Sequence, residues 1–200
     1  MTDITTEMVK NLREKTGVGI MDCKVALKEC KGDLDAAVDY LRKKGIATAK
    51  KRSSRTTSNG QVQSYIHGGG KLGVLVEVNC ETDFTGKTED FTDFVKDIAM
   101  QIAAANPASV DRNTIPPQIL EREKEIYATQ ARESGKPENV IEKIVEGKLN
   151  KFYSEACLLD QPFVKNPDIT IQDYLNEMIA KTGENIVINR FARFQLGDKE

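Results

Sequence analysis

Apolar residues recur at helical spacing in three short segments between residues 5 and 45. The pattern predicts a first helix capped by Thr5, a second that stops at Gly32, and a third that is capped by Asp33 and ends before Gly45. The predicted inner faces carry Met8, Val9, Leu12, Cys23, Ala26, Leu27, Cys30, Leu34, Ala37, Val38 and Leu41. Three helices of this length form a miniature bundle, which we expect to be only marginally stable alone because it has about 45 residues.

Strict alternation appears next, in Leu72–Cys80, where Leu72, Val74, Val76, Val78 and Cys80 share one side. The segment QVQSYIH at residues 61–67 precedes it, and three glycines at 68–70 separate the two segments, which predicts a hairpin. The closing stretch 184–197 is rich in β-branched and aromatic residues and predicts a third strand. The strands therefore lie at both ends of a helical run.

Four longer amphipathic segments fill that run. They are predicted as helices over about 88–105, from Pro116-Pro117 to about 134, from Pro137 onward, and after a capping pair formed by Thr170 and Asp173. We read the stripe of each helix as core, including Ile119 and Ile126 in the second. The fold class is α+β: an N-terminal three-helix bundle joined to a core made of a small three-stranded antiparallel sheet with helices.

The predicted organisation has three parts: a helical domain at 1–46, a basic linker at 47–60 and an α+β core at 61–200. The linker contains Lys50, Lys51, Arg52 and Arg55. An RNA-phosphate contact and a solvated hinge both fit such a stretch, and the hinge is favoured because no aromatic residue lies among the charges. A three-stranded sheet of this kind also has exposed edges and a bare face, which predicts burial against a second copy of the chain.

The residues that follow the strand predicted at Leu72–Cys80 no longer alternate between apolar and polar. Glu81, Thr82 and Asp83 favour a turn, yet they lead into a large apolar ring, Phe84. A rigid strand that delivers a carboxylate and a phenyl ring into a loop suggests a surface for contact with a partner. The alternative is that Phe84 belongs to the core and Asp83 is a helix N-cap.

Charge and composition narrow the function classes. Lys and Arg number 29 against 31 Asp and Glu, so the net charge of −2 provides no whole-molecule attraction to nucleic acid or anionic lipid. The N-terminal residues lack the apolar region of a signal peptide, and no run approaches a membrane span. We expect a cytoplasmic protein, or a mature organellar one, that binds neither a membrane nor nucleic acid directly.

The sequence contains no arrangement that indicates catalysis. Serine, histidine and acidic residues form no recognisable triad, and HExxH is absent. Four cysteines form no CxxC pair and His67 is the single histidine, so we expect small buried thiols and no metal. Glu81 and Asp83 lack the further oxygen ligands of a calcium loop. No enzyme activity and no cofactor are predicted.

Three separated motifs resemble a known family. LREKTGVGIMDCKVALKECKGDLDAAVDYLRKKG at 12–45 is similar to the N-terminal module of the elongation factor Ts family, whose fold resembles a ubiquitin-associated (UBA-like) three-helix domain. SYIHGGGKLGVLVEVNCETDF at 64–84 resembles the core hairpin with its TDF signature. EGKLNKFYSEACLLDQPFVK at 146–165 resembles a later helix and turn. The resemblance spans nearly the whole chain and implies a guanine-nucleotide exchange factor for elongation factor Tu, without covalent chemistry.

The resemblance also implies the site residues. The family's TDFV segment is associated with dislodging Mg²⁺ from the GTPase, which points here to Thr82, Asp83, Phe84 and Thr85. Thr85 departs from the usual Val and costs about 1 kcal/mol of apolar contact at most. The family's N-terminal module packs on the nucleotide domain of the GTPase, which implies contacts from Arg13, Ile20, Met21 and Lys24. Ile20 stands where the motif usually has Met, a volume-conserving change.

The single hairpin and single closing strand resemble the short form of this family. That form associates into a homodimer, which predicts a 2:2 complex with elongation factor Tu in its GDP-bound and nucleotide-free states. The alternative function is a plain binding module, in which the three-helix unit holds a peptide, a ubiquitin-like partner or RNA. The exchange function requires competition between GDP and this protein, whereas a plain binding module would be indifferent to GDP.

Overall fold

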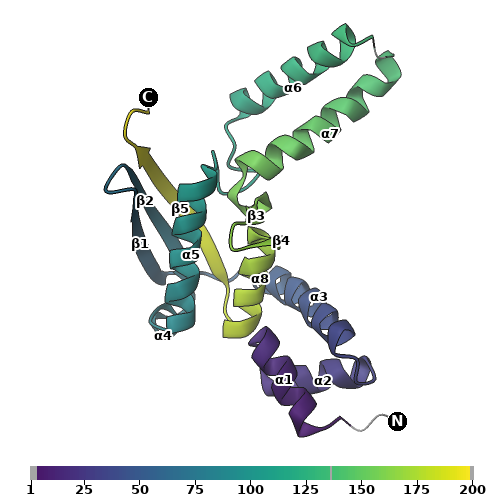
Figure 1. Ribbon diagram of the computed structural model, residues 1–200, viewed down its shortest axis with the longest axis vertical. Coiled ribbons are helices and arrows are strands. Elements are labelled where there is room, and N and C mark those ends of the chain that lie inside the picture. The colour runs from purple at the N-terminus through teal and green to yellow at the C-terminus, as the bar shows by residue number, and fades with distance from the viewer. Residues whose placement is uncertain (1–3, 136, 199–200) are drawn as a thin grey trace. The chain divides into compact units, whose positions relative to one another are not determined.

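The structure, a computed structural model, describes residues 4–135 and 137–198 (Figure 1). The chain forms two compact units, each made of separate segments. Unit 1 contains the chain up to Gln61 together with Val78–Phe94 and Asp173–Val187. Unit 2 contains Val62–Glu77, Val95–Gln172 and the chain from Ile188 onward. The predicted domain limits at residues 1 and 200 lie outside the described residues, and the predicted domain boundaries stay a prediction.

The N-terminal part of unit 1 is the predicted three-helix bundle. It contains α1 (Thr6–Thr16), α2 (Ile20–Glu29) and α3 (Leu34–Arg52). The predicted caps are present, because the Thr5 hydroxyl accepts from the Met8 N–H and the Asp33 carboxylate accepts from two N–H groups of α3. A common core confirms the predicted inner faces, and it consists of Val9, Leu12, Cys23, Ala26, Leu27, Ala37 and Leu41.

The third helix is longer than the sequence predicts. We expected it to end before Gly45, whereas α3 continues to Arg52, so that prediction is wrong and part of the expected linker is helical. Gly45 is buried in the helix and lies against α8 (Ile171–Thr182), where the neighbouring side chain is Ala180. Packing against α8 supports the helical conformation past this glycine, which the helical pattern of α3 alone does not reveal.

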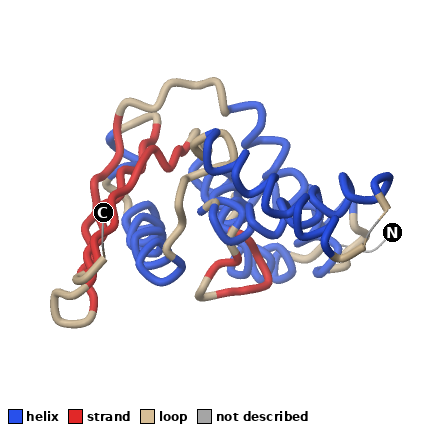
Figure 2. Tube along the Cα trace, turned by 90° about the horizontal axis from the view of Figure 1, so that it is seen from above, coloured by secondary structure: helices blue, strands red, loops and turns tan. Residues whose placement is uncertain are grey.

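The predicted sheet is confirmed. It consists of β1 (Asn59–His67), β2 (Leu72–Cys80) and β5 (Ile186–Gln195) in the antiparallel order β1-β2-β5. Val74, Val76, Val78 and Cys80 are all buried, as their alternation predicted. All three tip glycines at 68–70 have positive φ, which explains a glycine turn between the two strands. The strands are shown in red in Figure 2.

The helices between the strands match the amphipathic segments. They are α5 (Glu89–Ala105), α6 (Pro117–Glu133), α7 (Glu138–Ala156) and α8. Helices α6 and α7 pack against each other, with Ala131, Ile141 and Leu149 buried. The expectation that Ile119 and Ile126 lie in the core is wrong, because their exposed fractions are 41% and 37%. Helix α6 packs mainly against α7, so part of its apolar stripe stays in solvent.

A small motif in unit 2 was not predicted. After the 3₁₀ turn η1 (Leu158–Asp160), strands β3 (Pro162–Phe163) and β4 (Asn166–Thr170) form an antiparallel pair. Gln101 of α5 is fully buried beside it, where its Nε2 donates to Gln161 Oε1 at 3.1 Å and its Oε1 accepts from the Val164 N–H at 2.9 Å. The buried amide thus satisfies backbone that a strand of two residues cannot pair.

The cysteines Cys23, Cys30, Cys80 and Cys157 are free thiols, and Cys30 is the least buried. Over residues 4–135 and 137–198, no helix combines the length and the apolar character that crossing a membrane demands.

Candidate partner-binding site

The residues after β2 form a short capped helix. Strand β2 ends at Cys80, and α4 (Asp83–Gly86) begins two residues after Glu81. Thr82 is its N-cap, with extended backbone and a hydroxyl that accepts from the Thr85 N–H at 3.3 Å. Thr85 itself is only 4% exposed, so its side chain supports the turn from inside the chain. The segment expected to be a loop is therefore an ordered helical turn.

Phe84 is presented to solvent by this turn. Its exposed fraction is 79%, the largest among the exposed apolar side chains of the described residues. The alternative that Phe84 belongs to the core, with Asp83 as an N-cap, is wrong, because Thr82 is the cap and Asp83 is the first helical residue. A phenyl ring held in water on a defined turn gains nothing for folding, which favours a role in contact with another molecule.

Asp83 lies beside Phe84 and pairs within the same turn. Lys87 Nζ donates to Asp83 Oδ2 at 2.7 Å, and both side chains are largely exposed. This hydrogen bond and the Lys87 charge lower the pKa of the Asp83 carboxyl, so the group is ionised at neutral pH. The turn therefore exposes an apolar ring next to a negative charge.

The lower side of the turn packs tightly on the strands. The Gly86 carbonyl accepts from Gln61 Nε2 at 2.7 Å, and a Cβ on Gly86 would lie 3.5 Å from Cys80 Sγ and 3.6 Å from Gly60 Cα. Cys80 Sγ donates to the Thr82 carbonyl at 3.1 Å, and burial raises the pKa of this thiol. These contacts hold the start and the end of α4 against β1 and β2.

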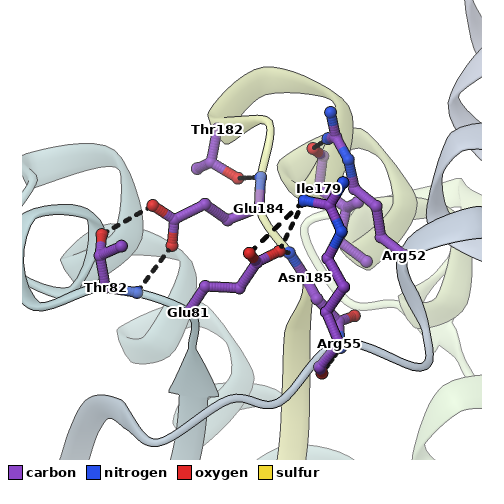
Figure 3. Close-up of polar contacts among 8 residues, drawn as sticks. All are labelled: Arg52, Arg55, Glu81, Thr82, Ile179, Thr182, Glu184 and Asn185. Atoms are coloured by element: carbon purple, nitrogen blue, oxygen red, sulfur yellow. Dashed lines mark hydrogen bonds and ion pairs between the residues drawn. The ribbon is translucent and has the colours of Figure 1, made fainter.

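Two carboxylates connect the turn and its preceding strand to the residues that follow α8 (Figure 3). Glu184, between α8 and β5, accepts from the Thr82 N–H at 3.0 Å and from the Thr82 hydroxyl at 2.7 Å. Glu81, directly after β2, accepts from the Asn185 N–H at 2.6 Å. The strand that leads into the turn and the strand that closes the fold are thus joined by reciprocal bonds from adjacent residues.

The segment at the end of α3 contacts the same residues, Glu81 and Asn185. Arg55 Nη1 lies 3.3 Å from Glu81 Oε1, and the Arg55 carbonyl accepts from Asn185 Nδ2 at 2.9 Å. Arg52, the last residue of α3, donates to the Ile179 carbonyl at 3.3 Å (Figure 3). Two of the cations that the sequence assigned to a hinge therefore make intramolecular contacts.

The acidic residues near the turn do not gather around a common point. Each pairs with a different cation: Glu77 with Arg190, Glu81 with Arg55, Asp83 with Lys87 and Asp90 with Lys181. In the part of the chain that the structure describes, no group of three or more His, Cys, Asp or Glu side chains could hold a metal ion.

The second predicted set lies on α1 and α2. Ile20 and Met21 open α2 with exposed fractions of 54% and 70%, and Arg13 and Lys24 are also exposed. Gly19 caps α2 without a side chain, which leaves the start of the helix uncovered. The two predicted sets belong to unit 1 but are carried by separate elements. Each set combines exposed apolar atoms with charge.

Sequence reasoning missed the residues that hold the turn. Glu184 acts on Thr82 from 102 positions away, and Asn185 acts on Glu81 from 104 positions away. Both lie just after α8, where a turn with polar residues is ordinary. A local pattern contains no signal for such a pairing.

Comparison with known proteins covers nearly the whole chain. The family model described as Elongation factor TS matches residues 34–198. Relatives named Elongation factor Ts are 60% identical in Desulfosudis oleivorans over 198 residues (99% of this chain, 100% of the relative) and 61% identical in Geobacter sulfurreducens over 195 residues (98% and 90%). A relative of the same name in Carboxydothermus hydrogenoformans is 58% identical over 195 residues (98% and 90%). The chain belongs to the elongation factor Ts family.

Proposed function

We propose that this protein is a guanine-nucleotide exchange factor that promotes release of GDP from elongation factor Tu. Family membership supports the partner and the role. The observation that carries the mechanism is Phe84, which is 79% exposed on a capped turn beside an ionised Asp83. The protein acts by binding and makes or breaks no covalent bond.

The physical problem is a tightly held nucleotide. In GTPases, Mg²⁺ and the phosphate-binding loop hold the nucleotide by many charge-assisted bonds, so release is slow until that set is disturbed. A factor that binds the nucleotide-free state better than the loaded state accelerates release. By reciprocity, GDP or GTP then weakens the binding of the factor by the same ratio.

Phe84 is the wedge in this proposal. Its ring enters an apolar gap in the GTPase, and burial there gains the transfer free energy that the ring lacks in water, on the order of 2 kcal/mol. Asp83 enters with it and disfavours the original arrangement of metal and phosphates by its negative charge. Thr82 and Thr85 contribute through the fold of the turn, because one caps it and the other is buried beneath it.

The start of α2 supplies a second contact. Ile20 and Met21 are apolar and exposed, and Arg13 and Lys24 add positive charge beside them. We assign this surface to the nucleotide domain of elongation factor Tu. A second contact lets the factor stay bound while the wedge acts, so affinity and acceleration depend on different residues.

The exposed part of the sheet supports self-association. In unit 2, Ile66, Leu75 and Phe194 line a groove with a volume of about 530 Å³, and their exposed fractions are 66%, 50% and 72%. Apolar side chains gathered on three neighbouring strands indicate an interface. The occupant we assign is the same face of a second copy, which gives a homodimer and a 2:2 complex with elongation factor Tu.

The test is release of a fluorescent GDP analogue from elongation factor Tu with and without this protein. We expect the release rate to rise with the concentration of the factor and to saturate, and excess GDP to dissociate the protein complex. Binding that is indifferent to GDP would instead support a plain binding module.

A further inference from the structure

We propose that Glu184 is the positioning residue of the exchange turn: its carboxylate fixes Thr82 and thereby the direction in which Phe84 points. This inference rests on the proposed exchange function and adds a residue that the TDF signature does not contain. It concerns a contact between segments 102 positions apart in the sequence. Glu184 acts through Thr82 and does not itself touch the partner.

The geometry carries the inference. Glu184 Oε2 accepts from the Thr82 N–H at 3.0 Å and Oε1 accepts from the Thr82 hydroxyl at 2.7 Å, so both oxygens engage one residue (Figure 3). Two bonds from one planar carboxylate to the backbone and the side chain of Thr82 fix that residue's rotamer. The same hydroxyl accepts from the Thr85 N–H and thus caps α4. The rotamer that Glu184 selects is the one that closes the turn.

The turn needs such a fixed point. It has only four helical residues, a length at which an isolated helix does not persist in water. Its outer residues are exposed, so Phe84 contributes no packing that would hold it. Contacts below the turn come from Gln61 and Cys80, and these act on Gly86 and on the Thr82 carbonyl. Glu184 instead accepts a hydrogen bond from the backbone N–H of the cap residue, Thr82.

A carboxylate suits this place better than an amide. Thr82 donates two hydrogen bonds to Glu184, one from its backbone N–H and one from its hydroxyl, so two acceptor oxygens are required at once. A glutamine offers one acceptor and would place its NH₂ group against one of those donors. The neighbouring Glu81 cannot substitute, because its Oε1 already accepts from the Asn185 N–H and pairs with Arg55.

The experiment compares Glu184→Gln with the shorter acid Glu184→Asp and with a matched control, Asp160→Asn. Asp160 is a carboxylate of unit 2 that accepts two close hydrogen bonds from Arg112, so its loss is a comparable structural change outside the turn. The full-length protein is used throughout. Two readouts are taken: hydrogen exchange of the Thr82 and Thr85 amides by NMR, and release of fluorescent GDP from elongation factor Tu.

Glu184→Gln is expected to speed exchange at both amides about tenfold, the change that ~1.4 kcal/mol produces. The maximal rate of GDP release should fall about tenfold, while the half-saturating concentration should change less than about threefold because the α2 surface is intact. Glu184→Asp keeps two acceptor oxygens and should restore part of the amide protection and part of the maximal release rate. Asp160→Asn should change neither.

Three results would overturn the positioning role. One is unchanged exchange at the Thr82 amide in Glu184→Gln, and another is an unchanged maximal release rate when that amide does exchange faster. The third is an equal loss of release in Asp160→Asn, which would indicate a general stability effect. If the parent protein itself failed to accelerate release, the proposed function would fall, and the amide exchange would still decide whether Glu184 fixes the turn.

Discussion

Gly45 of α3 lies against Ala180 of α8: a Cβ on Gly45 would be 3.5 Å from the Ala180 Cβ and 3.7 Å from the Asn176 carbonyl oxygen. Both distances are ordinary van der Waals contacts, so a methyl group fits. Glycine inside a helix costs about 0.5–1 kcal/mol relative to alanine. Gly45→Ala should therefore raise the free energy of unfolding by about this amount, measured by urea denaturation.

Gly147 in α7 provides the control for this prediction. A Cβ there would meet nothing within 4 Å, so Gly147→Ala should gain from helix propensity alone. A loss of stability in Gly45→Ala, with a gain in Gly147→Ala, would contradict the fit of a methyl group between α3 and α8.

Phe84→Ala should separate function from folding. Because the ring is 79% exposed, the free energy of unfolding should change by less than about 0.5 kcal/mol. The maximal rate of GDP release should fall about tenfold or more, since the wedge is removed. Ile119→Ala on α6 removes another exposed apolar side chain and should leave release unchanged. A folded Phe84→Ala protein that accelerates release as well as the parent would refute the wedge.

Met21→Ala should weaken binding to elongation factor Tu. The side chain is 70% exposed, and burying it in an interface is worth roughly 1–2 kcal/mol, or about 5- to 30-fold in the dissociation constant. Titration calorimetry with the nucleotide-free GTPase measures this change. Lys10→Ala removes an exposed member of a pair with Glu14 on α1 and should have little effect. Equal affinities of Met21→Ala and Lys10→Ala for the GTPase would show that the start of α2 is not part of the interface.

The free energy of unfolding should depend on pH through the carboxylate of Glu184. Burial raises the pKa of Glu184, but the hydrogen bonds from Thr82, Thr85 and Glu81 outweigh it and the net pKa is lowered from 4.5. A lowered folded pKa means that the contribution to stability is present above about pH 4.5 and is lost as the pH falls through the folded pKa.

Glu184→Gln isolates this effect because the neighbouring ionisable groups stay unchanged in the variant: the Glu81–Arg55 pair, Asp83 and the Cys80 thiol. The difference in the free energy of unfolding between the parent and Glu184→Gln should be constant near neutral pH and shrink below about pH 4.5. Thermal unfolding at several pH values measures it. A difference that grows on acidification would contradict the assignment.

Phe194→Asp should disrupt self-association. It places a charge in the groove beside Ile66 and Leu75, where a second copy would have to desolvate it. Sedimentation at micromolar concentration should detect a dimer for the parent and a 22.3 kDa species for the variant. Phe84→Asp alters a similarly exposed ring in unit 1 and should leave the dimer intact. A monomeric parent would end the dimer proposal.

The fold could be read from the sequence where one periodicity dominates. The alternation in Leu72–Cys80 placed its buried face correctly because that face has one partner layer. The end of α3 was missed because Gly45 is a helix terminator by local chemistry, and only its contact with Ala180 explains why the helix continues. The strands β3 and β4 were missed because they are too short to show a period.

The candidate site was predictable only in part. Asp83 and Phe84 were singled out because polar turn formers followed by a large ring are unusual after a buried strand, and the structure places that ring in solvent. The sequence alone could not decide whether Thr82 or Asp83 caps the helix, since both residue types favour the N-cap position. Glu184 could not be found, because its partner is distant along the chain.

The unequal burial of the cysteines makes the protein ready for single-site labelling. Cys23, Cys80 and Cys157 are buried, and burial raises the pKa of each thiol, which keeps the reactive thiolate scarce. Cys30, at the end of α2, is the accessible thiol. A maleimide dye would thus attach to the N-terminal bundle without any engineered cysteine, which provides a fluorescent reporter on the module assigned to the GTPase.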